Sequence, residues 1–149
     1  MRGPDRLVAE LSCMQVINRY ATAVDAVDLD LLRSCFFTDV EASYAGRPLA
    51  PGVDPIVELI APLANTRGTI HNLGPVYVSA HGSQAHATAG CLVLAVTGDD
   101  APHGVIRGLK YAFDLEHREG EWRIVRLVHE VLWATAAPQS GPTGQPLTS

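Results

Sequence analysis

The sequence has few cysteines and no long apolar run. Its three cysteines, Cys13, Cys35 and Cys91, are far apart and odd in number, which argues against a disulfide framework and against a zinc-binding spacing. Each lies in an apolar stretch, so we expect three small buried hydrophobic residues. No run approaches the ~20 residues that span a bilayer, and the first six residues lack a signal-peptide core. We therefore predict a cytoplasmic protein with no membrane partner.

Positive charge is also scarce. Eleven lysines and arginines against sixteen acidic residues give a net charge of −5, and the basic residues are scattered. Nucleic acids and anionic membranes are bound by clustered basic side chains, so neither is expected as a partner. The 47% of hydrophobic residues and the length of 149 suit one globular domain. We expect this domain to occupy residues 1–137 and the polar tail, residues 138–149, to be disordered.

The first half of the chain shows helical periodicity. Apolar residues recur every three or four positions over residues 5–27, which predicts one long amphipathic helix. Asp28 is expected to cap a second helix over residues 29–36, and a short strand follows over residues 40–44. Asp54 is expected to cap a third helix that begins with Pro55, and Pro62 should kink or shorten it.

From residue 69 onward the pattern changes to strands. We expect strands over residues 70–80, 84–96, 105–117 and 121–134, separated by polar turns at residues 81–83, 97–100 and 119–120. Consecutive strands with short connections form an antiparallel meander. Three helices followed by such a sheet predict an α+β fold, in which the helices pack across the hollow face of a curved sheet and enclose a pocket.

Six segments of the chain, in this order, resemble the SnoaL-like branch of the nuclear transport factor 2-like superfamily: residues 19–25, 28–32, 36–39, 69–72, 108–111 and 118–124. The resemblance implies a cone-shaped α+β barrel, open at one end, with a curved antiparallel sheet wrapped around the N-terminal helices. It also implies a homodimer that forms through the outer sheet face. Members of the superfamily include dehydratases, isomerases, cyclases and proteins with no catalytic activity, so the site must be argued separately.

Tyr20, Asp25 and His71 form the first candidate site. Tyr20 and Asp25 lie five residues apart near the end of the first helix, and His71 opens a strand that this fold places beneath that helix. An imidazole can take and return a proton near neutral pH, and a carboxylate on its other nitrogen stabilises the imidazolium. Similarly placed Tyr, Asp and His groups form the working site of scytalone dehydratase and of a bile-acid dehydratase.

Tyr44 is a further candidate for catalysis. Ketosteroid isomerase, a member of the superfamily, has its catalytic aspartate at about this point of the short strand, whereas this chain has a tyrosine. That departure argues against steroid isomerisation of the usual kind, and it favours elimination, because the dehydratases place a tyrosine in this region. A core tyrosine and a catalytic tyrosine remain equally good interpretations of Tyr44.

The remaining candidates concern the substrate. We expect Val24, His86, His129 and Trp133 to bind it, and whether one or both of the two histidines face the hollow stays open. Three other histidines fall at turns or strand ends and are expected to be solvated: His81, His103 and His117. Lys110 and Arg126 are expected to face outward, because an unpaired buried cation is costly. No histidine pair has the helical spacing of a zinc site, so we expect no metal and no cofactor.

These observations predict a cofactor-independent lyase or isomerase of the dehydratase or cyclase type. His71 would be the base, Asp25 its orienting group, and Tyr20 with Tyr44 the donors to an oxygen of a small hydrophobic polyketide-like or steroid-like substrate. The alternative is a non-catalytic binding or assembly domain of the same fold. Epoxide hydrolysis is a third possibility, but the Asp-Arg-Asp set that it uses is not evident in the sequence. The sequence leaves open the substrate and the choice among dehydration, isomerisation and cyclisation.

Overall fold

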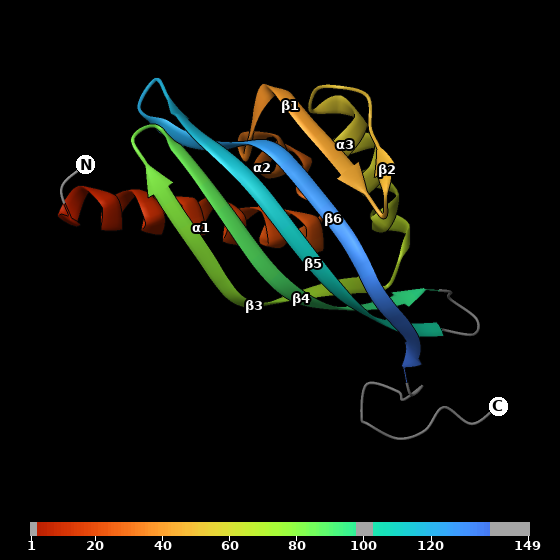
Figure 1. Ribbon diagram of the computed structural model, residues 1–149. Coiled ribbons are helices and arrows are strands. Elements are labelled where there is room, and N and C mark those ends of the chain that lie inside the picture. The colour runs from red at the N-terminus through yellow and green to blue at the C-terminus, as the bar shows by residue number, and fades with distance from the viewer. Residues whose placement is uncertain (1–2, 98–102, 138–149) are drawn as a thin grey trace.

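A computed structural model describes residues 3–97 and 103–137, and it confirms the predicted α+β fold (Figure 1). The expected disordered tail, residues 138–149, lies outside the described residues, as does most of the turn at residues 97–100. The elements are α1 (Gly3–Ala26), α2 (Leu29–Ser34), β1 (Phe36–Tyr44), β2 (Arg47–Pro48), α3 (Asp54–Ile60), the 3-10 helix η1 (Ala61–Asn65), β3 (Gly68–His81), β4 (Gln84–Thr97), β5 (His103–Arg118) and β6 (Glu121–Ala137).

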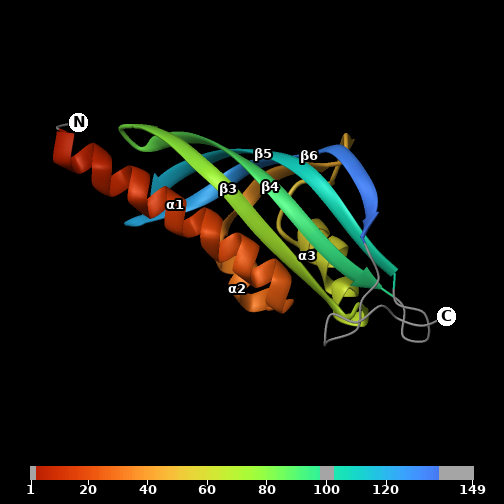
Figure 2. The same cartoon turned by 90° about the horizontal axis from the view of Figure 1, so that it is seen from below.

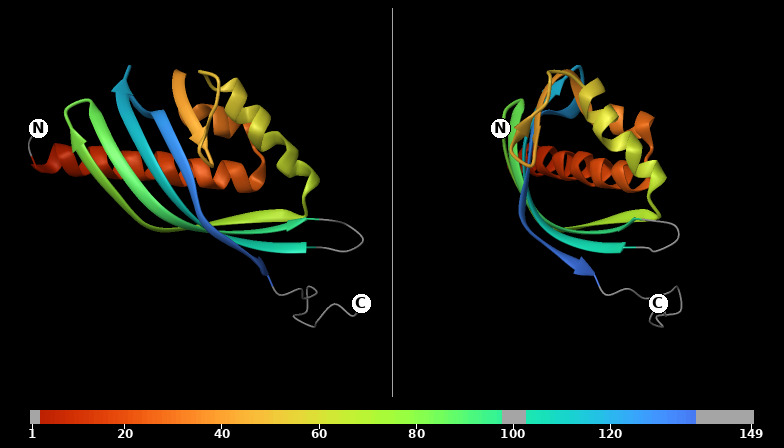
Figure 3. Two further views of the ribbon diagram at one scale, coloured as in Figure 1. Left: turned by 45° about the vertical axis from the view of Figure 1, so that its right-hand side comes forward. Right: turned by 90° about the vertical axis from the view of Figure 1, so that its right-hand side faces the viewer.

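The six strands form one curved, open sheet in the order β2-β1-β6-β5-β4-β3. Strands β3 to β6 make the predicted antiparallel meander, but β1 pairs with β6 in parallel, so the sheet is mixed and not wholly antiparallel. The reason is topological: the chain leaves β1 through β2 and the helices, starts β3 at the far edge of the sheet, and returns in β6 with the direction of β1. Figure 3 shows the sheet curving around the helices.

Several element boundaries differ from the sequence-based expectations. Asp28 does cap α2, since its carboxylate accepts from the Leu31 N–H at 2.9 Å, but α2 ends at Ser34 and the next strand already begins at Phe36. Asp54 is not the N-cap of α3. Val53 holds that position, and Asp54 instead forms an ion pair with Arg33 at 2.7 Å.

The third helix is short, as Pro62 predicted. Helix α3 ends at Ile60, and the chain tightens into η1 across Pro62, because the proline lacks the N–H that would continue the α-helix.

The two-residue strand β2, at Arg47–Pro48, lies where a loop was expected. It pairs with the end of β1. No helix in the described ranges has both the length and the apolarity needed to cross a membrane.

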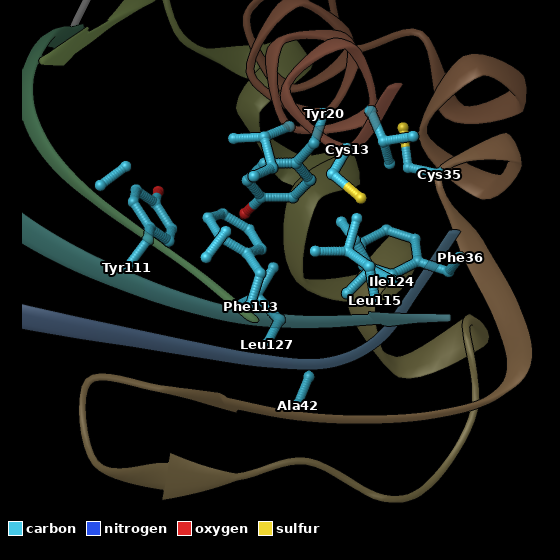
Figure 4. Packing of buried hydrophobic residues seen from close by; sticks show 14 of the residues in the cluster. Cys13, Tyr20, Cys35, Phe36, Ala42, Tyr111, Phe113, Leu115, Ile124 and Leu127 are labelled. Atoms are coloured by element: carbon cyan, nitrogen blue, oxygen red, sulfur yellow. The ribbon is translucent and has the colours of Figure 1, made fainter. Parts of the chain in front are cut away.

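The core lies between α1 and the inner face of the sheet. Helix α1 runs across the hollow side, mainly against β3 (Figure 2). Its buried side chains meet those of β5 and β6, such as Phe113 and Leu127 (Figure 4). The three cysteines are buried and free, and burial raises the pKa of the Cys13 thiol to about 12 and those of Cys35 and Cys91 to about 11. They are therefore inert small hydrophobic residues, as predicted.

Side chains on the strands alternate between the two faces of the sheet. On β5, Leu109, Tyr111, Phe113 and Leu115 are buried on the inner face, while Lys110 between them is exposed on the outer face. The strand register carries this alternation to the neighbouring strands, because Tyr111 pairs with Ala89 of β4 and with His129 of β6. This alternation decides which of the candidate side chains face the hollow.

Candidate active site

Asp25 and His71 meet where the end of α1 crosses β3. The His71 Nδ1 lies 2.6 Å from the Asp25 Oδ1, and the other carboxylate oxygen accepts from the backbone N–H of His71 at 2.8 Å. The Thr69 hydroxyl also donates to the Asp25 Oδ1, at 2.9 Å. A carboxylate can only accept, so in the neutral tautomer of His71 the proton lies on Nδ1 and Nε2 keeps its lone pair. The His71 side chain is 9% exposed and that of Asp25 is 27% exposed.

Tyrosines from three elements converge beside this pair. The Tyr20 hydroxyl, from α1, lies 2.9 Å from the Tyr44 hydroxyl at the end of β1, and the Tyr111 ring of β5 lies edge-on to Tyr20 with the ring centroids 6.0 Å apart. Figure 4 shows Tyr20 reaching from the helix toward the strand that carries Tyr111. Burial raises the pKa of all three phenols, so they stay protonated at neutral pH. Only one hydrogen joins Tyr20 to Tyr44, so one of their hydroxyls keeps a hydrogen for a third acceptor.

His129 completes the polar wall on β6. Its ring lies against Tyr44 and Tyr111, with centroid distances of 5.1 and 5.2 Å. The Nδ1 of His129 is buried without a hydrogen-bond partner among the described residues. Burial lowers the pKa of this imidazole, and the nearby His71 and Arg107 lower it further. His129 is therefore a neutral imidazole at physiological pH.

These groups line a cavity of about 250 Å³ on the inner side of the sheet. Its size lies just below the range of about 300–1,000 Å³ that is usual for ligand pockets, which fits a small molecule. The apolar part of the wall comes from α1, from the short helices α3 and η1, and from β4 and β5. The lining residues are Tyr20, Val24, Tyr44, Leu59, Ile60, Leu63, Thr69, His71, Val93, Ala95, Arg107, Leu109, Tyr111 and His129.

Residues 5–128 match the family model for the SnoaL-like domain. The chain belongs to this family. No curated protein is significantly similar to it in sequence. The fold is shared with solved structures that are less than 25% identical, and at such identity the likeness shows the fold alone.

Three of these structures illustrate the likeness. A hexachlorocyclohexane dehydrochlorinase, LinA type 2, superposes with a TM-score of 0.83 at 17% identity, over 95% of this chain and 99% of that one. The LinA type 3 enzyme of Novosphingobium barchaimii gives 0.82 at 16% identity, over 99% of both chains. A protein of Novosphingobium aromaticivorans that is provisionally named a scytalone dehydratase gives 0.79 at 19% identity, over 96% and 95%.

The structure brings most of the predicted site residues of this SnoaL-like domain together. Tyr20, Val24, Tyr44, His71 and His129 all line the cavity. Asp25 is not among the lining residues and is joined to the cavity wall by its hydrogen bonds with His71 and Thr69. Of the two strand histidines, His129 is the one that lines the cavity.

His86 and Trp133 do not line this cavity, contrary to expectation. His86 lies on the outer face of β4, exposed, with its Nδ1 2.7 Å from Asp114. Trp133 lies 49% exposed over Gly108, where an added Cβ would come within 2.3 Å of the indole ring. The alternation of side chains between the two faces of the sheet explains both corrections. His86 falls between the buried residues Ala85 and Ala87 and so points outward. Trp133 pairs with Gly108, just before an irregularity in the β5–β6 pairing.

Tyr111 and Arg107 are cavity residues of the SnoaL-like domain that the sequence analysis missed. Both belong to the set of β5 side chains with odd residue numbers, which point to the inner face. The alternation of Leu109, Phe113 and Leu115 with polar neighbours was a signal that could have found them.

The remaining polar residues lie outside the site. Lys110 and Arg126 are exposed as expected, and Arg126 is 3.4 Å from Asp114. His81 and His117 are exposed, while the side chain of His103 lies outside the described part of the chain. In the ranges 3–97 and 103–137, no group of three or more His, Cys, Asp or Glu side chains could hold a metal ion.

Proposed function

We propose that this SnoaL-like protein is a cofactor-independent lyase or isomerase that removes a proton from a carbon next to a carbonyl group. The observation that carries the proposal is the Asp25–His71 pair in the wall of an apolar cavity. The Nε2 of His71 would take the proton, and the Asp25 carboxylate would stabilise the imidazolium that forms. Apolar walls exclude water and so strengthen these interactions.

The tyrosines supply the complementary group. As the C–H bond breaks, negative charge builds on the carbonyl oxygen, and a phenol hydrogen of the Tyr20–Tyr44 pair would stabilise it. In a dehydration the enolate then forms a carbon–carbon double bond and expels a β-hydroxyl group. The His71 imidazolium returns its proton to that hydroxyl, which leaves as water. In an isomerisation the same proton returns to another carbon of the substrate.

The class of substrate follows from the cavity and from the structural relatives. A small apolar hollow with a few convergent polar groups suits a hydrophobic ring compound of the polyketide or steroid type. The relatives named above are a dehydrochlorinase and a provisionally named dehydratase, and both names describe an elimination. Likeness of fold lends this direction only general support, so the proposal depends on the site.

Deuterium exchange would test the base without knowledge of the natural substrate. The probe is 1-tetralone, an apolar bicyclic ketone, in D2O, and its exchange next to the carbonyl is followed by proton NMR. We expect the protein to accelerate exchange and His71→Asn or Asp25→Asn to reduce that acceleration about 100-fold or more. The matched control is His86→Asn, which breaks the other histidine–aspartate pair of the described chain, on the outer face.

Two outcomes would contradict the proposal. Exchange that persists in His71→Asn would exclude this imidazole as the base, and equal loss in His86→Asn would indicate a general effect on the fold. His71→Asn and His86→Asn should each melt within a few degrees of the parent protein. Binding of 1-tetralone without accelerated exchange would instead support the alternative, a non-catalytic small-molecule-binding domain.

We also propose a homodimer that forms through the outer face of the sheet. Exposed apolar side chains gather there on β3, β4 and β6, and they include Ile70, Leu92, Leu94 and Trp133. Burial of such a surface against a second copy would remove apolar area from water.

A further inference from the structure

A cation lines the same cavity as the proposed base. Arg107 lies on the inner face of β5 among the lining residues and is exposed to solvent. The strand register puts it in line with the base, since His71 pairs with Val93 of β4 and Val93 pairs with Arg107. Adjacent strands lie about 4.8 Å apart, so the backbones of His71 and Arg107 are separated by about 10 Å along the sheet.

The side chain of Arg107 makes no ion pair or hydrogen bond with any residue in the ranges 3–97 and 103–137, although its backbone belongs to the β-ladder. None of the residues lining the cavity is acidic. Asp25, which is not a lining residue, already accepts from Thr69 and twice from His71. The neighbouring His129 is neutral because its pKa is lowered. The guanidinium therefore has water as its partner when the cavity holds no ligand.

Binding of a neutral apolar ligand beside this unpaired guanidinium would be unfavourable. It would displace water from Arg107 and offer no hydrogen-bond acceptor of equal strength in return. A ligand with a carboxylate would replace that water with two charge-assisted hydrogen bonds, because the planar guanidinium matches the two oxygens. Arg118 shows this pairing within the chain, with Asp39 and Glu116 as its partners.

We propose that the substrate is a ring compound with a carboxylate, which Arg107 binds while the carbon to be deprotonated lies at His71. This inference rests on the function proposed above and adds the charge of the substrate to it. With the two backbones two strand spacings apart, the acid and the reacting carbon would lie on opposite sides of the ring system. Arg107 is then the residue that orients the substrate and selects it over neutral analogues.

Calorimetric binding of a matched pair of probes tests the inference. The probes are 2-naphthoate and 2-naphthamide, which share the ring system and differ in charge. We expect the protein to bind 2-naphthoate at least tenfold more tightly than 2-naphthamide. Arg107→Gln should abolish this preference by weakening 2-naphthoate alone, and Arg107→Lys should keep part of it because the charge remains.

The matched control is Lys110→Gln, which removes one positive charge from the outer face of the same strand. It should keep the full preference. The inference is overturned if the parent protein shows no preference, if Arg107→Gln retains it, or if Lys110→Gln loses it equally. His71→Asn should keep the preference while it loses deuterium exchange, so failure of the base and failure of the anion site can be told apart. Thermal melting of each variant shows that it is folded.

Discussion

Two histidine–aspartate pairs of nearly equal length occur on this sheet, at 2.6 Å for His71–Asp25 and 2.7 Å for His86–Asp114. Their surroundings differ. The His71 side chain is 9% exposed and faces a cavity, whereas that of His86 is 55% exposed on the outer face. Water competes for the hydrogen bonds of the outer pair and screens its charges. At the scale of single residues, the position of a pair, more than its geometry, favours a catalytic role.

His129 gives a prediction about pH. The pKa of this imidazole is lowered from the ordinary value of 6.5 in the folded protein, mainly by burial. Below pH 6.5 the unfolded chain therefore binds the proton more readily than the folded one, and the free energy of unfolding falls as pH falls toward the lowered pKa. His129→Gln should reduce this loss between pH 7.5 and pH 5.5, as measured by urea denaturation. His117→Gln, at an exposed position, should leave the loss unchanged, and an equal loss in His129→Gln would refute the idea.

At the scale of elements, the end of α1 is strained. Val27 follows the helix with φ at +50°, and the N–H groups of Val27 and Asp28 donate to the carbonyls of Val24 and Ala23. This is the pattern in which helices commonly end on glycine, because a side chain in the left-handed region costs about 1–2 kcal/mol.

We therefore expect Val27→Gly to raise the thermal midpoint of unfolding by a few degrees, since it relieves about 1 kcal/mol of backbone strain. Scanning calorimetry measures the change. Ala26→Gly, at the last residue of the helix, should lower the midpoint instead, because glycine is less favourable than alanine at a helical position. A lower midpoint in both variants would show that the packing of Val27 outweighs its strain.

The sequence predicted local structure better than it predicted which face of the sheet each strand side chain takes. Asp28 was found as a cap, and Tyr20 and Asp25 were placed on one helix, because each of these inferences needs only neighbouring residues. Which of His86 and His129 faces the cavity depends on the pairing of distant strands, and the irregularities after Gly108 and Asp114 shift that pairing. The parallel contact of β1 with β6 has no local signal either. Arg107 was missed although the alternation along β5 is a local signal for the face that its side chain takes.

At the scale of the whole molecule, the proposed dimer predicts a specific effect of charge on the outer face. Leu92→Glu places a carboxylate among the exposed apolar side chains of β3 and β4, so we expect it to convert dimers to monomers. Light scattering after size-exclusion chromatography measures the mass. The control is Leu11→Glu on α1, where the leucine is 60% exposed on another surface. Dissociation by the control alone would place the interface on the helix.

The origin of the cavity wall has a consequence for how new specificities arise. The proposed reacting groups stand on α1 and the strands, whereas Leu59, Ile60 and Leu63 come from the short helical segment between Asp54 and Asn65. Substitutions at Leu59, which is already half open to solvent, would enlarge or narrow the room for a ligand without moving the proposed base. Evolution can therefore change the accepted molecule and retain the proposed proton-transfer groups, which suits a framework that hosts many chemistries.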